Sequence, residues 1–79
     1  MRTLIRYEGF EVRIYTFDHS PPHVHVFKAG AVVRIELSSC TVTEIVGDIS
    51  DRDVTRAERL VAEHADALRQ TWRRLQEGH

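Results

Sequence analysis

The stretch HVHVFKAGAVVRIEL, residues 23–37, decides the fold because it consists of two alternating strand patterns joined by a turn. With Ala29 and Gly30 as the turn centre, Val26 lies opposite Val33 and the aliphatic side chains gather on one face. The opposite face then pairs His23 with Glu36 and His25 with Arg34. A three-residue loop would mix polar and apolar side chains on both faces. A four-residue turn with the same register remains an alternative, because alanine tolerates positive φ poorly.

A double proline precedes this hairpin. In DHSPPHVHV, residues 18–26, three of the five histidines fall within seven residues. Pro21 and Pro22 restrict φ and lack an N–H group, so they form a stiff connector that is neither helix nor central strand. His23 and His25 are two residues apart, which places them on the same face of a strand. Any chemistry of the protein is expected at this stretch.

The rest of the chain predicts further strands and a helix. Residues 3–7, 10–17 and 42–47 have strand patterns, and Ser50 is placed to cap a helix. Apolar residues recur at spacings of three and four over residues 51–76, which predicts one long amphipathic helix. Its apolar stripe must cover the aliphatic face of the sheet. The expected fold is α+β: a single domain over residues 1–79, with a four- to five-stranded antiparallel meander sheet over about 3–47 and one long C-terminal helix on one face.

Composition limits the possible roles. The formal net charge of −1 gives no overall attraction to nucleic acid or anionic membrane. The single cysteine, Cys40, cannot form an intramolecular disulfide, and no apolar run approaches the roughly 20 residues of a membrane span. We therefore expect a cytoplasmic protein without membrane contact. Trp72 is in register with the apolar stripe of the predicted helix, so we expect it to anchor the core or a homodimer.

The histidines are compatible with two kinds of chemistry. In a catalytic interpretation His19, His23 and His25 act as general acids or bases and Arg34 stabilises a phosphate or oxyanion, which suits RNA cleavage. In a metal interpretation His19, His23, His25 and Glu36 are the ligands of zinc, iron or nickel. Arg34 beside such an ion is unfavourable, so neither a metal nor another cofactor is predicted. Cross-strand polar pairs with a purely structural role remain the alternative to both.

The motif DHSPPHVH, residues 18–25, resembles the bacterial DUF4160 family, whose hallmark is an aspartate-histidine, a double proline and a histidine-x-histidine close. The similarity extends through Ile14-Tyr15, Gly30-Ala31 and a late helix with Trp72. It implies a small bacterial protein of a toxin–antitoxin-like or regulatory pair, with a small protein partner encoded nearby. The functional surface is then expected to be the sheet face with His19, His23 and His25. The alternative is a histidine-dependent ribonuclease or metal-assisted hydrolase that contacts RNA with the same residues.

Overall fold

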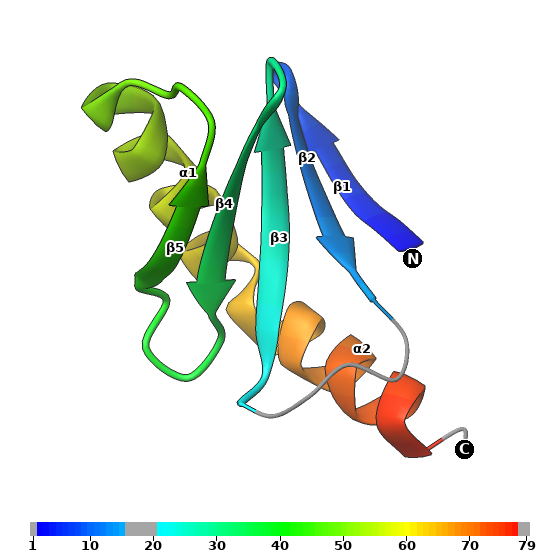
Figure 1. Ribbon diagram of the computed structural model, residues 1–79. Helices are drawn as coiled ribbons and strands as arrows, with labels where there is room; N and C mark the ends of the chain where they lie inside the picture. Colours follow the sequence, from blue (N-terminus) through cyan, green and yellow to red (C-terminus); the bar gives the residue numbers. More distant parts are fainter. Residues whose placement is uncertain (1, 16–20, 78–79) are drawn as a thin grey trace.

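The computed structural model describes the main chain of residues 2–15 and 21–77, in which five strands precede two helices (Figure 1). The strands are β1 (Arg2–Tyr7), β2 (Phe10–Ile14), β3 (His23–Lys28), β4 (Ala31–Glu36) and β5 (Val42–Val46). The helices are α1 (Asp51–Glu63) and α2 (Ala65–Glu77). Within the described residues no helix is long and apolar enough to span a membrane. The predicted α+β class is confirmed.

The strands form one sheet in the order β1-β2-β3-β4-β5, and every neighbouring pair is antiparallel. In the β3–β4 hairpin Val26 lies opposite Val33, as the alternation of the two strands predicts. Ala29 and Gly30 both have positive φ, 47° and 86°, and form a two-residue turn. The four-residue alternative is not adopted, so the hairpin accepts an unfavourable alanine conformation to keep its register.

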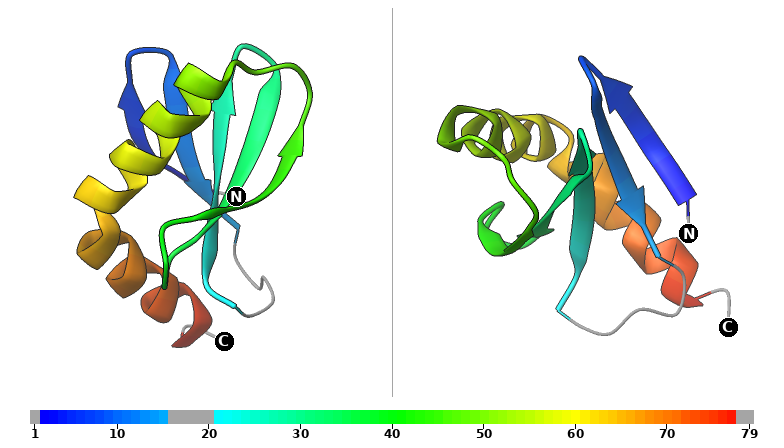
Figure 2. Two further views of the ribbon diagram at one scale, coloured as in Figure 1. Left: turned by 90° about the vertical axis from the view of Figure 1, so that its left-hand side faces the viewer. Right: turned by 45° about the horizontal axis from the view of Figure 1, so that its top comes forward.

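Both helices pack on one face of the sheet (Figure 2). The core consists of the inward side chains of β2, β3 and β4 together with the apolar stripe of the helices. Its members from the sheet and the following turn are Phe10, Val12, Ile14, Val24, Val26, Val33, Ile35 and Leu37. Its members from the helices are Ala57, Leu60, Val61, Leu68 and Trp72. The predicted burial of the aliphatic sheet face under the apolar stripe is confirmed.

The prediction of one long helix over 51–76 is wrong, because the helix breaks at His64. In a continuous helix the main-chain N–H of His64 would donate to the carbonyl of Leu60. Instead the Nδ1–H group of the His64 ring donates to Leu60 O at 2.9 Å, and the main-chain N–H donates to Val61 O at 3.1 Å. The side chain thus replaces one rung of the helical ladder, which is a known cause of kinks. The next helix resumes with Leu68 N–H donating to His64 O at 3.0 Å.

Each helix is also tied to the sheet by a polar contact. Ser50 caps α1, and its Oγ accepts from Asp53 N–H at 3.1 Å, as predicted. Further along α1, Glu58 Oε2 accepts from the main-chain N–H of Val42 in β5 at 3.3 Å. On α2, Arg69 Nε donates to Leu37 O at 2.8 Å, just after β4. The two helices therefore hold different parts of the sheet.

Candidate functional site

The face of the sheet that the helices leave uncovered carries the residues that the sequence singled out. We call it the open face; it lies in front in Figure 1. Alternation along the strands assigns side chains to it, because residues opposite each other in an antiparallel ladder share a face. Its central residues come from three neighbouring strands. They are Arg13 of β2, Tyr15 directly after β2, His23, His25 and Phe27 of β3, and Arg34 and Glu36 of β4.

His25 lies at the centre of the open face. Its ring makes edge-to-face contacts with Tyr15, at a centroid distance of 4.6 Å, and with His23, at 5.1 Å. In the ladder it lies between Arg13 of β2 and Arg34 of β4. The side chain is half-buried, so part of it remains accessible from solvent. An imidazole in this position can bind or exchange a proton with a molecule that docks on the open face.

His23 has a different environment, since only 3% of its surface is exposed. Its Nδ1 lies 2.8 Å from the carbonyl oxygen of Pro21. A carbonyl only accepts hydrogen bonds, so Nδ1 carries the proton and donates. The ring packs against Trp72 of α2 with the centroids 5.2 Å apart. His23 is therefore fixed by the connector and by α2, and it supports His25 from the side.

Arg34 approaches the two histidines from β4. One of its terminal nitrogens, Nη2, lies 3.5 Å from His23 Nδ1. Because that Nδ1–H is committed to Pro21 and a guanidinium can only donate, this approach is a contact between two donors and not a hydrogen bond. Arg34 Nε is enclosed and has no hydrogen-bond partner among the described residues. An enclosed donor without an acceptor is energetically costly.

A network of charged side chains borders this cluster. Glu11 receives hydrogen bonds from Arg13 and from Arg6, the latter with Nε 2.9 Å from Oε1. Arg13 first and Arg6 second lower the pKa of Glu11 below the ordinary glutamate value. The guanidinium of Arg13 also lies over the Phe27 ring, 3.9 Å from its centroid. The network orders this side of the open face, and the single carboxylate of Glu11 is shared by two arginines.

Comparison with known families decides the relationship of the chain. The sequence profile of the domain of unknown function DUF4160 matches residues 9–73, which include β2 to β5 and most of both helices. The chain belongs to the DUF4160 family. No curated protein and no solved structure matches it. The matched range of this DUF4160 protein contains His23, His25, Arg34 and Trp72, so the whole described cluster lies inside the family domain.

The structure of this DUF4160 protein brings together part of the predicted site. His23, His25 and Arg34 are adjacent, and Glu36 lies opposite His23 in the ladder. His19 lies outside the described residues, and so does the metal set that would include it. The described residues contain no group of three or more histidine, cysteine or acidic side chains that could hold a metal ion.

Sequence reasoning missed the role of Trp72 beside His23. The sequence predicts that Trp72 anchors the core or a homodimer, and its burial, with 5% of its surface exposed, confirms the place in the core. Its contact with the first histidine of β3 has no signal in the sequence, because the two residues lie in separate elements with unrelated periods. Alternation along β3 predicts that His23 and His25 share a face, but it does not indicate that His23 is buried, with 3% of its surface exposed.

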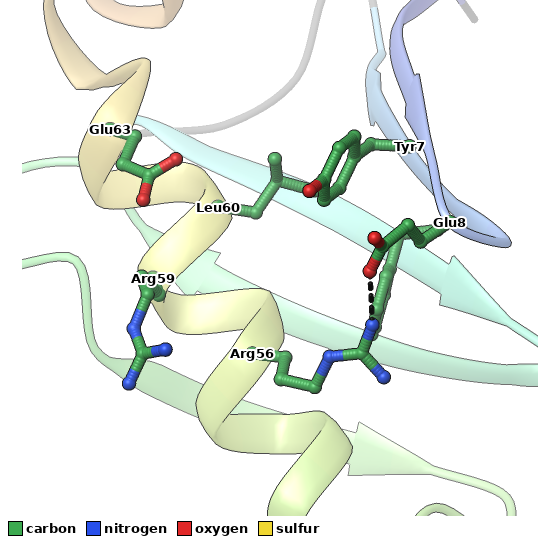
Figure 3. Close-up of a pocket in the computed structure, with 7 residues that line it drawn as sticks. Tyr7, Glu8, Arg56, Arg59, Leu60 and Glu63 are labelled. Atoms are coloured by element: carbon green, nitrogen blue, oxygen red, sulfur yellow. Dashed lines mark hydrogen bonds and ion pairs between the residues drawn. The ribbon is translucent and has the colours of Figure 1, made fainter.

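A cavity of about 280 Å³ lies elsewhere, between the β1–β2 turn and α1 (Figure 3). Its lining residues are Tyr7, Glu8, Phe10, Arg56, Arg59, Leu60 and Glu63. Arg56 is ion-paired with Glu8 across the cavity and with Asp53 on its own helix. The pair with Glu8 holds the turn against α1, which is a structural role. The open face remains the candidate functional site.

Proposed function

We propose that this DUF4160 protein is a small member of a toxin–antitoxin-like or regulatory pair and binds its protein partner through the open face. The observation that supports this most directly is the cluster of the half-buried side chains of Tyr15, His25 and Arg34 on the open face, with the buried His23 beside them. Half-buried aromatic and guanidinium groups of this kind are the residues that dominate the binding energy of protein interfaces.

The charge balance of the open face favours a protein partner over nucleic acid. Alternation and register assign three arginines and three glutamates to this face: Arg6, Arg13, Arg34, Glu11, Glu36 and Glu44. Nucleic-acid binding depends on a net excess of cations that displace counterions from the phosphates. A face with equal numbers of both signs lacks this excess, whereas it suits the mixed polar surface of a protein interface.

A histidine-dependent ribonuclease is the second candidate, and one specific arrangement favours it. His25 is half-buried and could act as a general base, while the half-buried guanidinium of Arg34 could stabilise a phosphate oxygen. Tyr15 would orient the imidazole through its ring contact. This interpretation uses the same residues as the first, so one set of variants tests both.

The experiment compares His25→Ala and Arg34→Ala with Arg73→Ala, an exposed arginine of α2 away from the open face. Each variant is expressed in a bacterial host together with the product of the adjacent gene. Growth, bulk RNA integrity and co-purification of the neighbour are recorded, and melting curves verify folding. We expect His25→Ala and Arg34→Ala to lose both the effect on growth and co-purification, with RNA intact throughout, while Arg73→Ala behaves like the wild type.

Degraded RNA with the wild type and intact RNA with His25→Ala would instead select the ribonuclease. If both open-face variants fold and behave like Arg73→Ala, the proposal that the open face is the functional surface is wrong. The same outcome would remove His25 and Arg34 from any catalytic role.

A further inference from the structure

The last strand of the sheet, β5, is exposed on both of its faces. It forms one edge of the sheet, and every residue after Val42 in this strand is exposed. Ile45 is 47% exposed and Val46 is 59% exposed, and register places them on opposite faces, beside Val33 and Val32. Two neighbouring aliphatic side chains on opposite faces of an edge cannot both be covered by a helix. A strand laid alongside β5 would cover both.

The main chain at this edge points outward at Ile45. The Glu36 N–H donates to Thr41 O and Glu36 O accepts from Cys40 N–H, so the polar groups of Glu36 face the β5 side. Main-chain groups alternate along a strand, and therefore those of Arg34 also face β5 while those of Val33 face β3. Ile45, the partner of Val33, is then in a non-hydrogen-bonded pair. Its own N–H and C=O point away from the sheet.

Both edges of the sheet are interrupted. On β1 the exposed Arg6 and a register shift between Thr3 and Ile5 interrupt the edge, which are common ways to prevent strand pairing. On β5 a register shift between Arg34 and Ile35 leaves Thr43 as the extra residue, and Val42 N–H donates to Glu58 of α1. Beyond this shift Glu44, Ile45 and Val46 pair regularly with β4, and the exposed aliphatic side chains of Ile45 and Val46 distinguish this edge.

We propose that β5 binds an extended strand of the partner protein, which adds to the sheet as a sixth strand in antiparallel orientation. This rests on the proposed function in that it assumes a protein partner, and it names a second surface for that partner. Ile45, whose N–H and C=O point away from β4, would form the central hydrogen-bonded pair of the new ladder. Ile45 and Val46 would supply the apolar contacts on its two faces.

A second copy of the chain fits this edge poorly. If two copies paired through β5, the residues whose main-chain N–H and C=O point outward would lie opposite each other. The twofold axis that relates the two copies would then pass through one residue of β5. An axis at Glu44 sets two carboxylates directly opposite each other, and an axis at Val46 sets Glu44 opposite Asp48, which is also acidic. An axis at Ile45 sets Glu44 opposite the apolar Val46. Each of these registers leaves Glu44 mismatched.

A partner strand of different sequence resolves the mismatch. Glu44 is exposed and is the only charged residue of β5, so a basic side chain opposite it forms a favourable cross-strand pair. In antiparallel orientation the residues opposite Val46, Ile45 and Glu44 follow one another along the partner. The partner strand is therefore expected to carry two apolar residues followed by lysine or arginine.

The test uses two blocked synthetic peptides, Thr-Val-Val-Lys-Thr and the same peptide with glutamate in place of lysine. Each is titrated into the isotopically labelled protein, and amide shifts and hydrogen exchange are measured by NMR. We expect the lysine peptide to slow exchange at the Ile45 amide and to bind about fivefold more tightly than the glutamate peptide. The exposed substitution Glu44→Lys should reverse this preference.

Ile45→Pro provides a second variant. It removes only an outward N–H, so the β4–β5 ladder keeps its hydrogen bonds and peptide binding should be lost. Equal affinity for both peptides, an unchanged preference in Glu44→Lys, or shifts away from β5 would overturn the proposal. So would concentration-dependent protection of Ile45 in the protein alone, which would indicate a second copy. The open-face variant Arg34→Ala should still bind the lysine peptide, so a failure here and a failure of the proposed function are distinguishable.

Discussion

The rings of His23 and Trp72 lie 5.2 Å apart, centroid to centroid, so that α2 packs against the first histidine of β3. This contact and the hydrogen bond to Pro21 separate the roles of the two histidines. His23 is part of the packed interior, whereas His25 is accessible on the open face. Substitution of each should therefore have a different effect.

His23→Ala should lower the free energy of unfolding by about 1–3 kcal/mol, because it removes the hydrogen bond to Pro21 O and the packing of a buried ring against Trp72. His25→Ala should lower it by about 1 kcal/mol or less, since only ring contacts at a half-buried position are lost. Urea denaturation of both variants at one pH measures the difference. Equal losses would show that the two histidines share one structural role.

Ala29→Asn should stabilise the protein by about 0.5–1 kcal/mol. Ala29 has φ 47°, a conformation that asparagine tolerates much better than alanine, and Asn-Gly is the preferred pair for this turn. For a domain of this size the melting temperature should rise by roughly 2–8 °C. Ala67→Asn, on the exposed face of α2, is the control and should lower the melting temperature through helix propensity. A decrease for both would mean that the turn is not under strain.

Val26→Asp should unfold most of the protein, with a loss on the order of 4 kcal/mol, because Val26 is completely buried and a carboxylate there has no partner. Val46→Asp is the matched control, since Val46 is 59% exposed on β5. It should fold with a nearly normal circular dichroism spectrum. A folded Val26→Asp variant with an unchanged melting temperature would contradict the assigned inner face of the sheet.

Glu11→Gln should change how stability depends on pH. In the folded protein Arg13 and Arg6 lower the pKa of Glu11, so its ionised form stabilises the fold. That contribution is complete above the ordinary glutamate pKa and is lost as the pH falls through the lowered value. Urea denaturation at a series of acidic pH values should therefore show a shallower loss of stability for Glu11→Gln than for the wild type. Parallel curves would mean that the ion pairs with Glu11 are not maintained in solution.

The hairpin of β3 and β4 could be predicted in detail because both strands alternate. Only one register gathers Val24, Val26, Val33 and Ile35 on a single face, and the structure has that register. The pairs of the open face follow from it without further information. This is how residues such as His25 and Arg34 could be placed together from sequence alone.

The break in the helix could not be predicted because the apolar period continues across it. Val61, Ala65 and Leu68 are all buried, as in an uninterrupted helix. The helix breaks because the His64 side chain competes with the His64 main-chain N–H for the carbonyl of Leu60. The spacing of apolar residues does not indicate this competition. The burial of His23 could not be predicted either, because it depends on the position of Trp72 in α2.

The interruption at His64 divides the helical layer into two segments, α1 and α2. One segment is fastened to β5 through Glu58, and the other is fastened to the histidine end of the sheet through Trp72. Glu58 and Trp72 therefore hold different parts of the sheet from different helices. Substitutions at these two residues should have additive effects on the free energy of unfolding.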